Sequence, residues 1–285
     1  MVQEYLERQK FPSPGECIYC GARGDGVELT DEHIIPFSLG GNVEILQASC
    51  KSCAAVTSGL ELHLGRTVLW DHRIHAKIPT RRPKERPDTL PARVSVAFGE
   101  EQTLHLPIQD HPYFLPMPVW GLPGALTGAQ PSTQFPEEMA HLFYHIPPNI
   151  RDTLKLSDGE IAQIMVPEIK IDSHKFARAM AKIAYCQAVV FYGLRGFRRL
   201  AIADLILGKY PLIPYFVGCE TKNPPPPTPG KGLHMVDLRT VFIGRMTLIV
   251  GSVRLFAHSG TAEHGTPLYR VVVGAPKLPQ PGETR

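Results

Sequence analysis

The chain has 285 residues, of which 43% are hydrophobic, so it is long enough to bury a substantial core and to form more than one domain. No stretch approaches the roughly 18 uninterrupted apolar residues of a membrane span, and the first ten residues lack the apolar run of a signal peptide. We therefore expect a cytoplasmic protein without membrane contact. The net charge of +3 is too small to indicate a nucleic-acid partner by itself.

The first motif consists of two CxxC pairs, Cys17 with Cys20 and Cys50 with Cys53. Each pair can place two thiolates on one metal ion, so two pairs predict a tetrahedral four-cysteine zinc site. A plain zinc ribbon separates its pairs by about 15–20 residues. Here 29 residues lie between the pairs, so the zinc would hold together a longer insert.

The centre of this insert reads DEHIIP at 31–36, followed by Gly40-Gly41. Alternating or β-branched residues predict short strands at 27–30 and 34–35, and a helix begins near Cys50. A carboxylate next to a histidine, in a segment that a metal stabilises, is typical of a functional site.

Together these motifs resemble the HNH endonuclease family, over about residues 16–65. The resemblance implies a ββα-metal fold in which the four cysteines bind structural zinc. It also implies that His33 is the general base that activates water against a phosphodiester, and that Glu32 is the first ligand of a catalytic Mg²⁺ or Mn²⁺. Asp31 is a further candidate. It would either support the metal ligand Glu32 or, if Glu32 points away, bind the metal itself.

Two positions depart from the commonest family pattern. Ile45 stands where an Asn usually orients the base, and Ala54 stands where a His or Asn usually binds the metal. Thr57 and Glu61 share a helical face with Ala54, so either could supply the missing oxygen ligand. Both an active variant site and an inactivated site stay open from the sequence. A charge pair of Glu61 with Arg66 or Arg73 is the alternative role for this carboxylate.

The charge is divided between neighbouring segments. Residues 16–61 carry seven acidic and two basic side chains, whereas residues 62–86 carry seven basic and two acidic ones. An acidic pocket followed by a basic arm fits a nuclease, because the arm would neutralise phosphates. A solvated, proline-rich linker over 66–90 is the alternative. The residues expected to bind nucleic acid are Arg66, Arg73, Lys77, Arg81 and Arg82.

Residues 91–285 are expected to form a second, α+β domain with an antiparallel sheet, so the whole chain is α+β. Alternation predicts a β-hairpin from 92–98 and 103–108. The proline-rich run 111–124 predicts no regular structure. The segment 136–146 predicts a short helix, in which His141 and His145 have the spacing of two metal ligands but are expected to serve packing.

The strongest helix is predicted over 174–197, with Ser173 as its cap and Gly193 near its end. Lys175, Arg178 and Lys182 form a basic edge that we expect to be solvated. A second helix is predicted over 197–207, and strands over 211–217, 240–257 and 268–274. A polyproline connector is predicted at 223–232.

The sequence thus predicts a metal-dependent endonuclease module at 1–65 that cleaves DNA, joined by a basic arm to an accessory domain of undetermined role. The alternative is a non-catalytic zinc module that binds nucleic acid or a partner protein. A homodimer through the C-terminal part is a further expectation. A third interpretation is that the C-terminal half is a sensor domain that controls the nuclease. This interpretation rests on analogy with other two-part proteins.

Overall fold

The computed structural model describes residues 8–80, 82–96, 99–136, 138–220, 226, 232–259 and 265–277. Its N-terminal part is a ββα unit, in which a hairpin leads directly into a helix. The hairpin strands are antiparallel, with an irregularity between Thr30 and Glu32, and a short first strand runs parallel to the middle one. These elements are β1 (Gln9–Phe11), β2 (Leu29–His33), β3 (Val43–Cys50) and α1 (Lys51–His63).

The predicted order of two strands and a helix is therefore correct, but the second strand was misplaced. Residues 34–35 follow β2 rather than forming a strand, and the partner of β2 is the longer β3. The chain between them passes through a short 3-10 turn, Phe37–Leu39, which ends at Gly40. Gly40 has a φ of 87°, a left-handed conformation that glycine adopts without strain.

The basic segment after α1 is largely helical. Leu64–Val68 forms a π-helical turn, α2 follows at Trp70–His75, and a 3-10 turn lies at Pro83–Glu85. Leu64 and Leu69 are completely buried. The first half of the predicted arm is thus anchored in the core, and its second half runs along the surface.

Two small sheets follow. One contains the predicted hairpin, confirmed as antiparallel β4 (Thr89–Val96) and β5 (Gln102–Pro107), with β8 (Ala162–Ile164) on its other edge. The other pairs β6 (Tyr113–Val119) with β7 (Met139–His145). Both predictions for these last two segments were wrong, because one was expected to be irregular and the other helical.

The prolines of β6 are tolerated for a geometric reason. Pro116 and Pro118 are two residues apart, so their backbone groups point to the same edge of the strand. The Pro118 carbonyl accepts a hydrogen bond of 2.8 Å from the Tyr269 hydroxyl. Proline is compatible with a strand at an edge where its missing N–H is not required.

The C-terminal half is built on one long helix, α5 (Ser173–Tyr192), and an antiparallel sheet. The helix was predicted correctly, although its cap is Asp172, whose side chain accepts from the Lys175 N–H. The sheet has the order β10-β13-β12-β11, with β9 also on β13. The strands are β9 (Phe197–Arg198), β10 (Val217–Glu220), β11 (Met235–Ile243), β12 (Met246–Arg254) and β13 (Leu268–Pro276).

Short helices connect these elements. The predicted second helix is present as α6, the run 211–217 forms α7 before it enters β10, and most of the polyproline connector lies outside the described residues. The short elements are α3 (Gly124–Thr127), α4 (Ile150–Thr153), α6 (Ile202–Ile206), α7 (Ile213–Phe216) and the 3-10 turn Ile108–Asp110.

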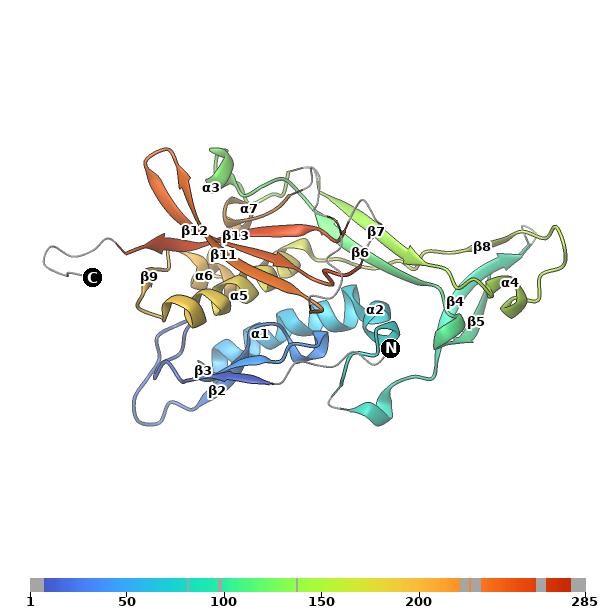
Figure 1. Ribbon diagram of the computed structural model, residues 1–285, viewed down its shortest axis with the longest axis horizontal. Coiled ribbons are helices and arrows are strands. Elements are labelled where there is room, and N and C mark those ends of the chain that lie inside the picture. Colours follow the sequence, from blue (N-terminus) through green and yellow to red (C-terminus); the bar gives the residue numbers. More distant parts are fainter. Residues whose placement is uncertain are drawn as a thin grey trace, which may run out of the picture.

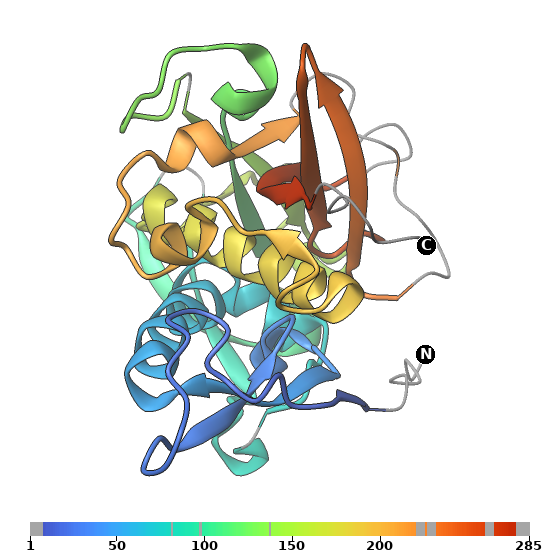
Figure 2. The same cartoon turned by 90° about the vertical axis from the view of Figure 1, so that its left-hand side faces the viewer.

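Helix α5 lies between the ββα unit and the C-terminal sheet (Figures 1 and 2). It contacts α1 on one side and β11, β12 and β13 on the other. Gly251 of β12 permits this approach, because a Cβ there would come within 2.6 Å of the Ala184 Cβ. One cluster of buried hydrophobic residues includes Cys17 at one end of the chain and Val273 at the other. The N-terminal unit therefore shares its core with the rest of the protein.

Cys186 and Cys219 are buried within this core, as expected for small apolar side chains. In the described part of the chain, no helix combines the length and apolar character needed to cross a membrane.

Buried histidines predict that the fold becomes less stable at acidic pH. His72 packs 4.2 Å from the ring of Phe256, and burial lowers its pKa to about 3. Burial likewise lowers the pKa of His234 to about 4. The unfolded chain would bind protons near pH 6.5, so stability should fall as the pH drops from about 6.5 toward 4.

We expect each of these two histidines to cost about 2 kcal/mol of unfolding free energy between pH 7 and pH 5. Urea unfolding at the two pH values measures the change, and His72→Leu should reduce it. An unfolding midpoint that is the same at both pH values would contradict the prediction.

Candidate active site

The four predicted zinc ligands converge. Their sulfur atoms all lie within 4.8 Å of one another, and the Cys20 and Cys50 sulfurs are 3.6 Å apart. A tetrahedral site with Zn–S bonds of about 2.3 Å requires sulfur separations of about 3.8 Å. In the described residues, this is the one group of histidine, cysteine and acidic side chains that converges in this way.

Local structure explains the convergence. Cys17 and Cys20 lie on a tight loop in which the Gly21 N–H donates to the Cys17 carbonyl. Cys50 ends β3, and Cys53 lies in the first turn of α1. The cluster therefore ties the loop before the hairpin to the junction of strand and helix. The donor set fits a structural zinc ion with no position left for water.

The hairpin irregularity determines which acidic side chain faces inward. The Gln47 N–H donates to the Asp31 carboxylate at 2.9 Å, and Gln47 itself has a φ of 45°. This bulge leaves Asp31 exposed at the rim and turns Glu32 into the interior, where only 5% of it is exposed.

Glu32 meets two predicted site residues from α1. The Thr57 hydroxyl lies 3.4 Å from Glu32 Oε2, and Glu61 lies one turn further along the same helical face. Ala54, one turn earlier, contributes its carbonyl as an acceptor for Thr57 at 3.3 Å. The structure thus brings Glu32, Thr57 and Glu61 together.

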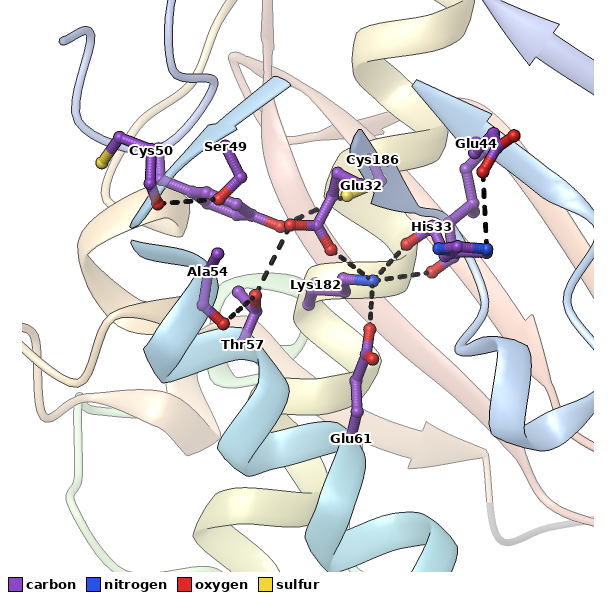
Figure 3. A network of polar contacts seen from close by, with 12 residues as sticks. Glu32, His33, Glu44, Ser49, Cys50, Ala54, Thr57, Glu61, Lys182 and Cys186 are labelled. Carbon is purple, nitrogen blue, oxygen red and sulfur yellow. Dashed lines mark hydrogen bonds and ion pairs between the residues drawn. The ribbon is translucent and has the colours of Figure 1, made fainter. Parts of the chain in front are cut away.

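A lysine from α5 lies between the two carboxylates (Figure 3). The Lys182 Nζ is 2.8 Å from Glu32 Oε1 and 2.8 Å from Glu61 Oε1. It also donates to the carbonyls of His33 and Ile34. Glu61 therefore pairs with this lysine, not with Arg66 or Arg73 as the alternative role assumed.

The placement of Lys182 was missed by the sequence analysis, which expected a solvated residue. Only 1% of it is exposed. The signal was present, because Lys182 shares a helical face with Cys186 and Val189, both apolar and buried. Arg178, on the same expected edge, is also engaged and donates to the Ile206 carbonyl at the end of α6.

Burial and charge act on this group in opposite directions. Burial alone would lower the pKa of Lys182, but the charges of Glu32 and Glu61 raise it well above its usual value, so the ammonium is retained. Burial raises the pKa of Glu32, and the negative charge of Glu61 adds to the increase, while Lys182 opposes it. The group thus holds two acidic side chains around one cation.

His33 lies beside the network, at the end of β2. Its Nε2 is 3.6 Å from Glu44 Oε2, and its ring makes an edge contact with Phe37. His33 and Glu44 are directly opposite each other across the hairpin. Lys10 also pairs with Glu44, at 3.1 Å. Glu44 is a second residue that the sequence analysis missed, although it adjoins Ile45, the position without the usual Asn.

Glu32, His33, Thr57 and Glu61 line one pocket of about 900 Å³. The pocket is also lined by basic residues and an aromatic ring. These residues are Arg66, Trp70, Arg73, Arg82 and Arg86. The acidic and basic segments of the sequence therefore both line the same pocket.

The predicted DNA-binding residues differ in their availability. Arg66 and Arg82 are exposed, and Arg82 pairs with Glu85 at 3.2 Å. Arg73 is buried, and it donates to the carbonyls of Gly65 and Ser38, so it stabilises the wall of the pocket. Lys77 is exposed outside the pocket lining. Arg81 lies outside the described residues.

A hairpin and helix joined by four cysteines, with an acid–histidine pair at the hairpin end, define a ββα-metal module. Residues 17–63 match the family model described as HNH endonuclease. The match confirms the resemblance seen in the sequence and covers the cysteine cluster, the hairpin and α1. No curated protein and no solved structure matched the chain in the two other comparisons.

The resemblance implies a catalytic divalent metal on Glu32 and the following helix. Glu32 and Glu61 do face each other as such a pair would, but the Lys182 ammonium takes up the space between them. A divalent ion there would lie beside a buried positive charge. In this arrangement the two carboxylates do not fit a catalytic Mg²⁺ or Mn²⁺.

Proposed function

We propose that the protein is an endonuclease that hydrolyses phosphodiester bonds in DNA. The observation that carries the proposal is one pocket that is lined both by His33 and the acidic network of the HNH-matched segment and by the exposed Arg66 and Arg82 that follow it. A phosphodiester needs a base to activate water and positive charge to stabilise the phosphate, and this pocket contains both.

In this proposal His33 is the general base. Its imidazole takes a proton from water, and the resulting hydroxide attacks phosphorus. Glu44, 3.6 Å from the His33 Nε2, orients the ring and stabilises its protonated form. Arg66 and Arg82 bind phosphates on either side of the scissile bond. Lys182 is buried and keeps Glu32 and Glu61 in place without contact with substrate.

Supercoiled plasmid provides the direct test. Purified protein should convert it to nicked or linear forms, and His33→Ala protein, prepared in parallel, should not. Reactions with Mg²⁺, with Mn²⁺ and with neither ion determine whether the cleavage requires a divalent metal. Intact plasmid under all of these conditions, with protein that retains its fold, would reject the nuclease proposal.

The basic residues of the pocket lead to a prediction on binding. Arg66→Ala/Arg82→Ala should weaken DNA binding for all sequences alike, because phosphate contacts carry no base information. If each arginine binds one phosphate, the slope of log K against log salt should flatten by about 2, at about 0.9 for each contact.

Fluorescence anisotropy with a duplex at several salt concentrations measures that slope. Arg239→Ala is the matched control, since Arg239 is exposed on β11 and does not line the pocket. An unchanged slope in the double variant would remove these two arginines from the DNA interface.

A non-catalytic nucleic-acid-binding module is the second candidate. Two observations favour it: Ala54 lacks a ligand atom in its side chain, and Lys182 already neutralises part of the acidic network. DNA binding that depends on Arg66 and Arg82, with no cleavage under any metal condition, would decide for this function.

A further inference from the structure

The space between Glu32 and Glu61 is a cation site that the Lys182 ammonium occupies. Four oxygen acceptors surround the Lys182 Nζ: one oxygen of each carboxylate, both at 2.8 Å, and the carbonyls of His33 and Ile34. An ammonium has three hydrogens to donate, so these acceptors satisfy it fully. Carboxylate and carbonyl oxygens are also the ligands that hard divalent cations prefer.

The surroundings keep the ammonium in this position. Lys182 extends from the middle of α5, where its neighbours Ala181 and Ile183 are completely buried. Only 1% of Lys182 is exposed, and it does not line the pocket. The second oxygen of Glu32 is engaged by Thr57 at 3.4 Å. The acidic side chains are therefore organised around the lysine.

We infer that Lys182 is the resident cation of this site and that it excludes a divalent ion from the Glu32–Glu61 pair. A divalent ion at the same oxygens would be repelled by the adjacent positive charge at low dielectric. Removal of that charge leaves two facing carboxylates and converts the site to one that binds a divalent metal. The inference rests on the contacts of Lys182 and does not require that the protein cleave DNA.

The test compares Mn²⁺ binding by wild-type and Lys182→Gln protein, measured by electron paramagnetic resonance. Glutamine removes the charge but retains an N–H donor for the carbonyls. We expect the variant to bind one Mn²⁺ at least about tenfold more tightly than wild type. The gain should be lost in Lys182→Gln/Glu61→Gln. Lys175→Gln is the matched control, because Lys175 is exposed on the same helix.

Two results would overturn the inference. One is a Mn²⁺ ion bound by wild-type protein and lost in Glu61→Gln, which would show that the ammonium does not exclude the metal. The other is folded Lys182→Gln protein with no gain in Mn²⁺ affinity. If the variant does not fold, wild type against Glu61→Gln decides, and equal Mn²⁺ binding by both supports the inference. Circular dichroism and zinc content establish folding in each case, and cleavage assays have no part in the outcome.

Discussion

Cys17→Ser protein is expected to lose its zinc and the fold of residues 8–63. Structural zinc on cysteine ligands contributes about 10–16 kcal/mol in small modules, which is comparable to the whole unfolding free energy of a domain, about 5–15 kcal/mol. The free energy lost with one zinc ligand should therefore be larger than the unfolding free energy of this unit, so the unit should unfold.

The damage should extend into the C-terminal half. The carbonyl of Ile18, next to Cys17, accepts hydrogen bonds from the Tyr185 hydroxyl and from Arg199. A disordered loop at Ile18 would leave the buried Tyr185 hydroxyl without this partner, which costs about 1–3 kcal/mol. Zinc by elemental analysis and amide hydrogen exchange over β2, β3 and α5 measure both effects.

Cys219→Ala is the control for this variant, since Cys219 is a buried thiol on β10, outside the cluster. It should retain about one zinc per chain. Full zinc content and wild-type exchange in Cys17→Ser protein would refute the four-cysteine site.

His33→Ala is expected to lower the rate of DNA cleavage by about 10²–10⁴-fold, the usual contribution of a general base. DNA binding and zinc content should be unchanged, because the His33 ring lies against Glu44 and Phe37, whereas the zinc ligands are the four cysteines and the expected phosphate ligands are Arg66 and Arg82. Single-turnover cleavage with excess protein separates the chemical step from binding.

Glu44→Gln provides a graded companion to that experiment. It retains the shape of the side chain but removes the charge 3.6 Å from His33 Nε2. Cleavage should fall by less than in His33→Ala, since the imidazole remains and loses only the charge of the neighbouring carboxylate. Cleavage that persists at the wild-type rate in His33→Ala would assign the base to another residue.

The local parts of the site were predictable from the sequence. The CxxC pairs, the acid–histidine pair and the helix after Cys50 lie within 50 residues, and their resemblance to the HNH endonuclease family indicated how they meet. Thr57 and Glu61 followed from helical periodicity. The strands β6 and β7 were not predictable in this way, because propensity penalises Pro116 and Pro118 regardless of which edge of a strand they face.

The roles of Lys182 and Glu44 were not predicted, for a different reason. Each acts through a partner that only the folded chain identifies: Lys182 through contact between α5 and α1, and Glu44 through the register of the hairpin. A lysine in an amphipathic helix is usually solvated, so the residue type predicted an exposed side chain, whereas Lys182 is buried. The apolar neighbours of Lys182 on its own helical face were the stronger indication.

The position of Lys182 in the chain also affects synthesis on the ribosome. About 150 residues separate it from Glu32, and translation at about 5–20 residues per second needs roughly 8–30 seconds to cover them. For most of that interval the nascent ββα unit already has all four cysteines but lacks the ammonium that pairs with Glu32 and Glu61. The unit can therefore close fully only after α5 has emerged, when most of the chain has been made.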